Sequence, residues 1–326
     1  STMEKVTGDY NWDRNVDKGD TFTIPKPIDG TGIELVDAES EVMEIVEPEP
    51  EPEGYNPTYG STYDRVMDRG YVICGTKANF PGFSEKKFVE FEDRWVGFEF
   101  LPTTYYDGQG FIVRRTLGVS SAKQLSGAKI CFSGSGTAKN NIKDFFKLHN
   151  LDYVPVEVPV DKKPKDLYID GKCDMYGTDA SGLASNRHGF KHPERHVILP
   201  EIISKEPLGP VVRYGDQQWS DIVRWTVYVL FLAEELGITS ENIEEFKEHK
   251  NPTIQRFMGE LNGKEDAYLG SKLGLYKEWA ADIIRYIGNY EEIYERNVGE
   301  NTPLRLKRGL NKLYTKGGLL YSPPLK

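Results

Sequence analysis

The turn at Ser133–Thr137 has the residue types of an anion-binding loop. Its members Ser135, Gly136 and Thr137 lead into a predicted helix, and the glycine lets backbone amides turn toward a ligand. Amides at a helix start, where the helix dipole is positive, attract negatively charged groups. We therefore expect this turn to suit the carboxylate of a small substrate.

A second turn, Gly177–Gly182, offers the opposite charge. Asp179 follows Thr178 at the start of another predicted helix, where a carboxylate either caps the helix or holds an ammonium group. Capping is the more common role for such an aspartate taken alone. Because an α-amino acid carries both a carboxylate and an ammonium group, the two turns together predict a pocket for a small polar molecule, or the relic of one.

Signatures of catalysis and metal binding are weak in this sequence. Gly134–Gly136 is neither a nucleophile elbow nor a phosphate loop, because no Gly-x-Ser-x-Gly occurs and no Gly-Lys-Ser/Thr follows. His188, His192 and His196 are spaced as metal ligands on one helix would be, but a glycine and a proline interrupt that helix. We expect no enzyme activity, no metal and no cofactor.

The elements that must position the two turns alternate between strand and helix. Repeated units of this kind are typical of a mostly parallel, doubly wound α/β sheet, whose ligands bind at the carboxyl ends of the strands. Both turns follow strands, so we expect both at this edge. The predicted strands cover 110–115, 128–132, 154–158, 173–176 and 197–199, and the predicted helices cover 137–149, 161–169 and 180–187.

The segments around this unit predict a second lobe. Residues 115–205 form lobe two, and the flanks 61–114 and 206–326 look incomplete alone. Flanks of this kind join into one lobe, here lobe one, so that the chain crosses between lobes twice. Within the flanks, a strand is predicted at 71–74, and helices are predicted at 61–67, 216–236, 241–249 and 277–296.

Residues 1–60 form an acidic extension rich in proline and glutamate. The run Glu47–Glu53 alternates the two residue types, which favours an extended polyproline II conformation. The extension is either a linker or arm, or a disordered solubilising tail.

Composition argues against several partners. The 326 residues include 41 Lys and Arg against 51 Asp and Glu, and the net charge of −10 has the wrong sign for binding nucleic acid or an anionic membrane surface. The longest apolar run, Val227–Ala233, is far shorter than the about 20 residues of a membrane span. Cys74, Cys131 and Cys173 allow one disulfide and leave at least one thiol.

Four stretches carry a distinctive pattern: Thr-Tyr-Tyr-Asp-Gly-Gln-Gly-Phe at 104–111, Thr-Asp-Ala-Ser-Gly-Leu at 178–183, His-Val-Ile-Leu-Pro-Glu-Ile-Ile-Ser-Lys-Glu-Pro-Leu-Gly-Pro at 196–210, and Asn-Tyr with Arg-Asn-Val-Gly within 289–299. From Ser61 to Pro324 the chain resembles the periplasmic general L-amino-acid-binding proteins of ABC transporters, in solute-binding protein family 3. The resemblance implies a type II periplasmic-binding-protein fold, with two α/β lobes joined by two hinge strands. It also implies a periplasmic location, or an organelle lumen or matrix if the source is eukaryotic.

The resemblance implies roles for individual residues. Asp179 matches the carboxylate that holds the α-amino group of the ligand, and Thr137 lies in the turn that faces its carboxylate. Phe83 and Ser84 correspond to a wall of the pocket in lobe one. Where relatives carry Gly-Thr-Thr-Thr, this chain has Ser135–Ala138, so two hydroxyl donors are absent.

A larger departure from the family lies between Phe100 and Leu101. Relatives carry about two further strand–helix units there, roughly 60 residues, including the arginine that clamps the ligand's carboxylate. They also commonly place a cysteine partner for Cys74 in that stretch. Burying a carboxylate without a charge partner costs several kcal/mol, out of about 8 kcal/mol for micromolar binding.

We therefore expect a non-enzymatic structural or interaction subunit with a degraded ligand site, in which a protein partner covers the truncated lobe one. The alternative is a working receptor for a polar amino acid in an ABC transporter, with Lys77 or Arg94 replacing the missing cation. Binding of an amino acid distinguishes the two hypotheses.

Overall fold

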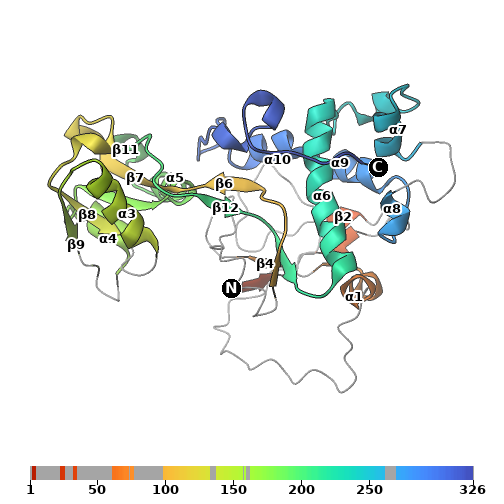
Figure 1. The fold of residues 1–326 in the computed structure, drawn as a ribbon, viewed down its shortest axis with the longest axis horizontal. Coiled ribbons are helices and arrows are strands. Elements are labelled where there is room, and N and C mark those ends of the chain that lie inside the picture. Colours follow the sequence, from red (N-terminus) through yellow and green to blue (C-terminus); the bar gives the residue numbers. More distant parts are fainter. Residues whose placement is uncertain are drawn as a thin grey trace, which may run out of the picture. The chain divides into compact units, whose positions relative to one another are not determined.

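The computed structural model describes residues 2–4, 23–25, 32–34, 61–72, 74–76, 98–132, 137–156, 158, 162–260 and 269–325. The chain forms two compact units, which are described separately (Figure 1). Unit 1 comprises residues 1–104, 209–297 and 308–326, and unit 2 comprises residues 105–208 and 298–307.

A five-stranded sheet forms the centre of unit 2. Its strands are β7 (Gln109–Arg114), β8 (Ala128–Phe132), β9 (Tyr153–Val156), β10 (Met175–Asp179) and β11 (His196–Ile198). They lie in the order β11-β7-β10-β8-β9. β8 is parallel to β9 and β10, whereas β7 runs antiparallel to both of its neighbours. Four strands therefore share one direction, as the alternation of strand and helix predicts.

Helices cover both faces of this sheet: α3 (Thr137–Leu148), α4 (Pro164–Ile169) and α5 (Ala180–His188). Successive residues of a strand point to opposite faces, so neighbours in β7 enter different cores. Phe111 packs with Ile142 of α3, whereas Ile112 packs with Leu183 of α5, and all four side chains are fully buried. Each such burial contributes about 1.5–3 kcal/mol.

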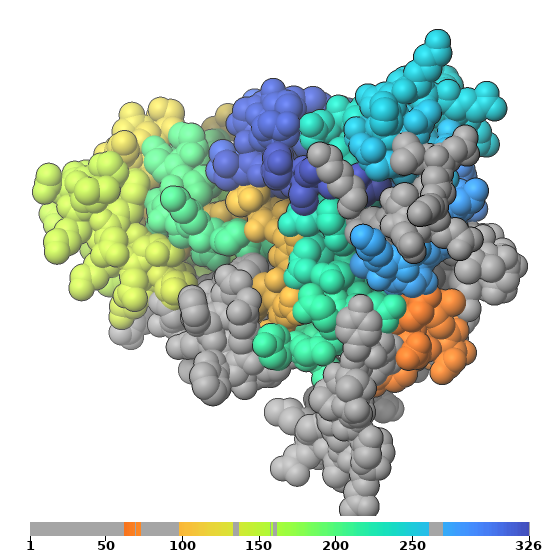
Figure 2. Space-filling view, turned by 45° about the vertical axis from the view of Figure 1, so that its right-hand side comes forward, coloured from red at the N-terminus to blue at the C-terminus, as the bar shows by residue number. Residues whose placement is uncertain are grey.

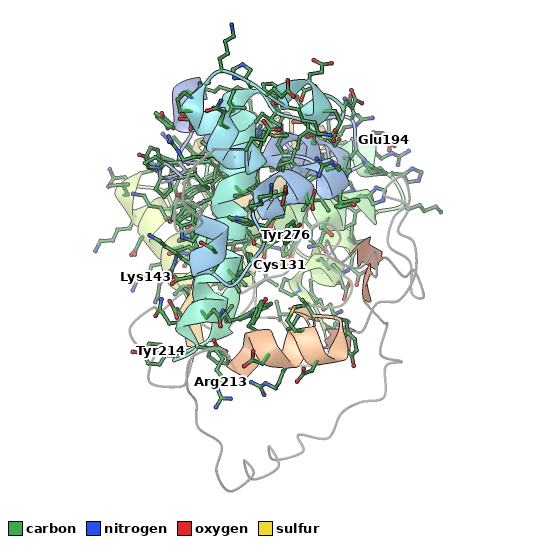
Figure 3. All side chains as sticks on the ribbon, turned by 90° about the vertical axis from the view of Figure 1, so that its right-hand side faces the viewer. Cys131, Lys143, Glu194, Arg213, Tyr214 and Tyr276 are labelled. Carbon is green, nitrogen blue, oxygen red and sulfur yellow. A yellow bond between two sulfur atoms is a disulfide. The ribbon has the colours of Figure 1, made fainter. Side chains whose placement is uncertain are left out.

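A disulfide joins Cys131 in β8 to Cys173, two residues before β10 (Figure 3 labels Cys131). Their Cα atoms are 5.7 Å apart, and the bridge closes a loop of 42 residues. The bridge is buried beside Leu167 of α4. Closing a loop of this length restricts the unfolded chain by roughly 4 kcal/mol, and such bridges persist in oxidising compartments. This is one of the pairings that the cysteine count left open.

Two antiparallel strand pairs lie where the chain passes between the units. In unit 2, β6 (Tyr105–Asp107) pairs with β12 (Glu206–Leu208). In unit 1, β5 (Phe98–Phe100) pairs with β13 (Val211–Arg213). β5 therefore runs into β6 through residues 101–104 alone.

The described part of unit 1 is mainly helical. Its helices are α1 (Ser61–Arg69), α6 (Gln217–Leu236), α7 (Pro252–Met258), α8 (Leu269–Lys272), α9 (Trp279–Ile287) and α10 (Tyr290–Asn297). Within the described residues its strands pair only two at a time. The remaining pairs are β1 (Thr2–Glu4) with β4 (Cys74–Thr76) and β2 (Thr23–Pro25) with β3 (Gly32–Glu34).

α6 organises the core of unit 1. It begins at Asp216, whose carboxylate accepts hydrogen bonds from Trp219 N (3.2 Å) and from Thr62 N of α1 (2.9 Å). Figure 2 shows α1 (orange) beside the segment around α8 (blue), where Tyr63 OH donates to Gly274 O at 2.7 Å. The apolar face of α6 packs with α7 and α9 in one buried cluster. One long amphipathic helix thus holds the smaller helices of unit 1 together.

Several predicted elements differ from the structure. The single helix predicted at 277–296 is two helices, because Gly288 adopts a left-handed φ of 80° and Asn289 starts a new helix. Asn289 Oδ1 accepts from Glu292 N (3.0 Å), and Glu292 Oε2 accepts from Asn289 N (2.7 Å), a reciprocal capping box. The helix predicted at 241–249 is only a 3-10 turn at Ile243–Phe246, and the strand predicted at 71–74 lies instead at β4.

The predicted division into lobes, 61–114 plus 206–326 and 115–205, stays a prediction. The compact units begin and end at other residues: β7 belongs to unit 2 because it pairs with β10, and residues 298–307 also belong to unit 2. Most of the acidic extension 1–60 lies outside the described residues.

A buried ion pair ties the C-terminal segment of unit 1 to α6. Arg308 and Glu234 form two parallel hydrogen bonds of 2.9 Å, with only 5% and 1% of their side chains exposed. Arg308 also donates to Asn311 O, and its guanidinium lies over the ring of Tyr290. Lys316 Nζ lies 3.4 Å from Glu234 Oε1. Both charges are therefore compensated inside the protein.

Removing one partner of this pair should destabilise the protein strongly. Arg308→Gln leaves Glu234 buried with only Lys316 nearby, and we expect a loss of about 3 kcal/mol in the free energy of unfolding. Lys247→Gln is the matched control, because Lys247 and its partner Glu244 both have more than half of their side chains exposed, and it should cost about 1 kcal/mol or less. Urea unfolding measures both. Equal losses would show that the buried pair has no special weight.

Candidate functional site

The carboxyl ends of β8 and β10, after which the two turns were predicted, lie side by side in the unit 2 sheet. The second prediction differs from the structure, because residues 177–179 are part of β10, which passes directly into α5. Phe132, the last residue of β8, pairs with Gly177 of β10. α3 then begins at Thr137 and α5 at Ala180, so the two helices start at neighbouring strand ends. Thr137 is exposed, and Thr178 and Asp179 are partly buried. Ser135 and Gly136 lie outside the described residues, as do Phe83, Ser84, Lys77 and Arg94.

Asp179 occupies the N-cap position of α5 without acting as its cap. Its backbone has the extended conformation of an N-cap residue (φ −56°, ψ 143°), but its side chain accepts no capping hydrogen bond. Capping was the more common role for an aspartate at this place in the sequence. Asp179 interacts with other groups of the protein, so its role in holding a cationic group stays a prediction.

The N-terminal turn of α5 is held by Asp107 of β6 instead. The Asp107 carboxylate accepts hydrogen bonds from Ser181 Oγ, from Ser181 N (3.4 Å) and from Gly108 N (2.8 Å). The neighbouring carbonyl of Gly108 accepts from Ala180 N at 2.8 Å. Burial raises the pKa of Asp107; its hydrogen bonds oppose this rise, and the nearby Glu206 adds to it.

The start of α3 is held by Gln109, two residues further along. The Gln109 side chain is 1% exposed; its Nε2 donates to Ala138 O at 3.2 Å, and its Oε1 accepts from Asn141 Nδ2 at 3.0 Å. Both helix N-termini are therefore anchored by the segment Asp107–Gln109. From the sequence, Asp107 with Gly108 marked only a turn, and neither Asp107 nor Gln109 was predicted to hold a helix start, although both stand in the distinctive stretch 104–111.

Gly108 lets this segment lie close to the returning chain. A Cβ atom at Gly108 would stand 2.4 Å from Ile202 Cγ2 and 2.5 Å from Ser204 O, closer than real Cβ contacts. Next to it, Gln109 N donates to Ser204 Oγ (2.8 Å), which donates to Glu206 Oε1 (3.0 Å). The absence of a side chain at Gly108 is thus part of the site's support.

The three histidines with metal-ligand spacing do not converge. His188 is the last residue of α5. His192 Nδ1 lies 3.6 Å from Glu194 Oε1, and His196 Nδ1 is hydrogen-bonded to Tyr168 OH at 2.7 Å. Across the described ranges, no group of three His, Cys, Asp or Glu side chains could hold a metal ion.

Comparison with known proteins found no matching family model. The chain is 52% identical to the general L-amino acid-binding periplasmic protein AapJ of Rhizobium johnstonii over 234 residues, covering 72% of this chain and 68% of the relative. It is 49% identical to the glutamate/glutamine/aspartate/asparagine-binding protein BztA of Rhodobacter capsulatus over 273 residues, covering 83% and 77%. It is 36% identical to the putative amino-acid ABC transporter-binding protein YhdW of Escherichia coli K12 over 321 residues, covering 82% and 93%.

The chain belongs to the periplasmic amino-acid-binding proteins of ABC transporters. A solved structure agrees: a periplasmic binding protein from Brucella ovis with glutathione bound has a TM-score of 0.66 at 44% identity, over 74% of this chain and 75% of that one. The resemblance inferred from the sequence, the type II fold and the periplasmic location are confirmed. These relatives of the amino-acid-binding family are solute-binding proteins and not enzymes.

The main functional hypothesis from the sequence is wrong. We expected a structural or interaction subunit with a degraded site. Two relatives that are 52% and 49% identical to this chain are amino-acid-binding proteins, and the Brucella ovis relative has glutathione bound, which contradicts that expectation. The hypothesis gave too much weight to the predicted deletion in lobe one. The alternative, a working receptor, fits the amino-acid-binding family better. The internal deletion, and a protein partner covering lobe one, stay predictions.

No helix in the part of the chain that the structure describes is both long and apolar enough to cross a membrane.

Gly108→Ala should disturb the site, because the added methyl group must displace Ile202 or the backbone at Ser204. We expect a loss of about 1–3 kcal/mol in stability, the usual cost of overpacking. Gly189→Ala is the control, since Gly189 has a negative φ and a Cβ there meets nothing closer than 3.6 Å. Thermal unfolding checks both variants. Equal melting temperatures for Gly108→Ala and the parent protein would contradict the proposed close approach.

Asp107 should also make stability depend on pH. Because its pKa is raised in the folded state, folding favours its protonated form, and that stabilisation is lost as the pH rises from about 3.9 through the folded-state pKa. The parent protein should therefore lose stability relative to Asp107→Asn across this range. Urea unfolding of both proteins at a series of pH values tests this. If the parent protein instead gains stability relative to Asp107→Asn as the pH rises, the prediction is wrong.

Proposed function

We propose that this protein is a working periplasmic receptor that binds a polar α-amino acid for an ABC transporter. The observation that carries the proposal is the common edge of unit 2, where α3 and α5 begin at adjacent parallel strands. Asp179 stands at that edge without capping α5. An edge that combines a carboxylate with a helix start suits a zwitterion.

In this proposal the charged head group of the amino acid is the recognised part. The Asp179 carboxylate accepts hydrogen bonds from the ligand's α-ammonium group, and Thr137 with the turn before it, including Ser135 and Gly136, faces the α-carboxylate. The ligands named for the relatives share this head group: glutamate, glutamine, aspartate and asparagine are α-amino acids, and the γ-glutamyl end of glutathione keeps a free α-ammonium and α-carboxylate. Thr178 supports Asp179 from the end of β10.

We propose that lobe one supplies the rest of the pocket in shortened form. Phe83 and Ser84 form a wall, and Lys77 or Arg94 supplies the cation for the carboxylate. Two observations support the shortening. β5 passes to β6 through residues 101–104 alone. The alignment with YhdW has 321 positions but covers only 82% of the 326 residues of this chain. Some of its positions are therefore gaps in this chain.

The proposed partner is the membrane part of an ABC transporter, to which the receptor delivers its ligand. The proposal includes no catalytic step and no cofactor. Its first test is calorimetry with L-glutamate, L-glutamine and glutathione, alongside N-acetyl-L-glutamine, which lacks the ammonium group. We expect saturable binding of at least one free α-amino acid and none of the acetylated analogue. No heat from any of the four ligands at millimolar concentration would overturn the proposal.

Replacing Asp179 should weaken binding without unfolding the protein. Asp179→Asn keeps the size of the side chain but loses the charge that pairs with the ammonium group, and we expect affinity to fall about tenfold to a hundredfold. Asp144→Asn is the matched control, because Asp144 is an exposed aspartate within α3. Calorimetry gives the affinities. Unchanged affinity for Asp179→Asn would remove Asp179 from the site.

A further inference from the structure

Tyr290, the first residue of α10, contacts the place where the chain leaves unit 1. Its hydroxyl donates a hydrogen bond of 2.5 Å to the carbonyl of Thr104, which lies 186 positions earlier in the chain. Thr104 is the last residue of unit 1 before β6. β6 ends at Asp107, and Asp107 and Gln109 hold the starts of α5 and α3. The hydroxyl therefore bonds the backbone directly before the strand that leads to both anchors.

The ring of Tyr290 is fixed by its neighbours. The residue is 7% exposed, and its ring packs edge-on against Phe231 of α6, with the two centroids 5.1 Å apart. Figure 1 shows α10 beside α6. The guanidinium of Arg308 lies 5.3 Å from the centroid of the same ring, and Arg308 is in turn bonded to Glu234. A close-packed ring of this kind holds its hydroxyl in one position.

The contacts of Tyr290 lie at the points where the chain passes between the units. Thr104 precedes the first passage, α10 ends at the third, and Arg308 follows the fourth. The second passage is joined to the first by a hydrogen bond of 2.9 Å from Leu101 N to Pro210 O. All of these contacts are made within unit 1. The four passages are 104–105, 208–209, 297–298 and 307–308.

A ligand that contacts two parts of a chain binds more tightly when the backbone between those parts is already fixed, because less conformational entropy is lost on binding. In the proposed function, groups from both units contact the amino acid. We propose that Tyr290 is a positioning residue for ligand binding: its hydroxyl fixes the carbonyl of Thr104, and with it the backbone that enters β6. This inference rests on the proposed receptor function.

Tyr290→Phe tests the inference, because phenylalanine keeps the ring between Phe231 and Arg308 but lacks the hydroxyl. The ligand is whichever of L-glutamate, L-glutamine and glutathione the parent protein binds most tightly by calorimetry. We expect the affinity of Tyr290→Phe for this ligand to fall about threefold to tenfold, the effect of losing one hydrogen bond.

Tyr276→Phe is the matched control. Tyr276 also lies in unit 1, and its hydroxyl donates to Asp282 Oδ2 at 2.6 Å, at none of the four passages (Figure 3 labels Tyr276). Both variants lose one tyrosine hydrogen bond and should lose similar stability, whereas only Tyr290→Phe should lose affinity. If Tyr290→Phe loses no more affinity than Tyr276→Phe, the hydroxyl of Tyr290 has only a structural role and the inference is wrong.

Amide hydrogen exchange in the ligand-free protein gives a second reading that does not depend on the proposed function. We expect the amides of Leu101 and of β6 to exchange about threefold to tenfold faster in Tyr290→Phe than in the parent protein. The amides of β8, inside the sheet of unit 2, should exchange as in the parent protein. In Tyr276→Phe both sets should be unchanged. Unchanged exchange at Leu101 and β6 in Tyr290→Phe overturns the inference.

The two measurements separate the inference from the proposed function. If the parent protein binds none of the three ligands, the proposed function fails and the role in binding fails with it, whatever the exchange rates are. If the parent protein binds and Asp179→Asn weakens binding, while Tyr290→Phe binds as Tyr276→Phe does, the proposed function stands and the inference is overturned. Weaker binding together with faster exchange in Tyr290→Phe alone supports the inference.

Discussion

The positions of the two helix N-termini depend on adjacent anchors in one short segment, the carboxylate of Asp107 and the amide side chain of Gln109. Asp107 bonds Ser181 at the start of α5, and Gln109 bonds Ala138 and Asn141 at the start of α3. Both helices begin beside neighbouring strands of one sheet, and the anchors fix how they begin. The segment continues directly from β6, which pairs with β12 where the chain passes between the units. The β6–β12 pair is therefore linked through this short segment to both helix starts.

This arrangement explains why α5 begins without a capping hydrogen bond from the side chain of Asp179. An N-cap aspartate normally satisfies the first amides of its own helix. Here the amides of Ala180 and Ser181 are satisfied by Gly108 O and by Asp107. The burial that raises the pKa of Asp107 is the cost of this support. The hypothesis of a degraded site rested on the predicted deletion in lobe one and did not consider these contacts in unit 2.

The sequence predicted those parts of the fold that follow from local pattern. The alternation of strand and helix correctly gave the sheet of unit 2, with β8 matched residue for residue, because buried strands and amphipathic helices have distinct periods. We predicted one helix here because the apolar spacing of α9 continues into α10. The break at Gly288 is instead marked by the capping box of Asn289 and Glu292, which starts a second helix. Contacts between distant residues were also hidden. Asp107 with Ser181, Arg308 with Glu234 and Cys131 with Cys173 are separated by 74, 74 and 42 positions, and no spacing rule links such pairs.

The central claim is that Asp179 holds the α-ammonium group of an amino acid at the edge where α3 and α5 begin. A crystal structure of the protein grown with the tightest-binding amino acid tests it most directly. The account predicts the ligand nitrogen at about 2.7–3.1 Å from a carboxylate oxygen of Asp179, the range of a charge-assisted hydrogen bond, with the ligand carboxylate facing the turn before Thr137. A ligand bound elsewhere, or an Asp179 side chain turned back to cap α5 with the ligand present, would contradict it.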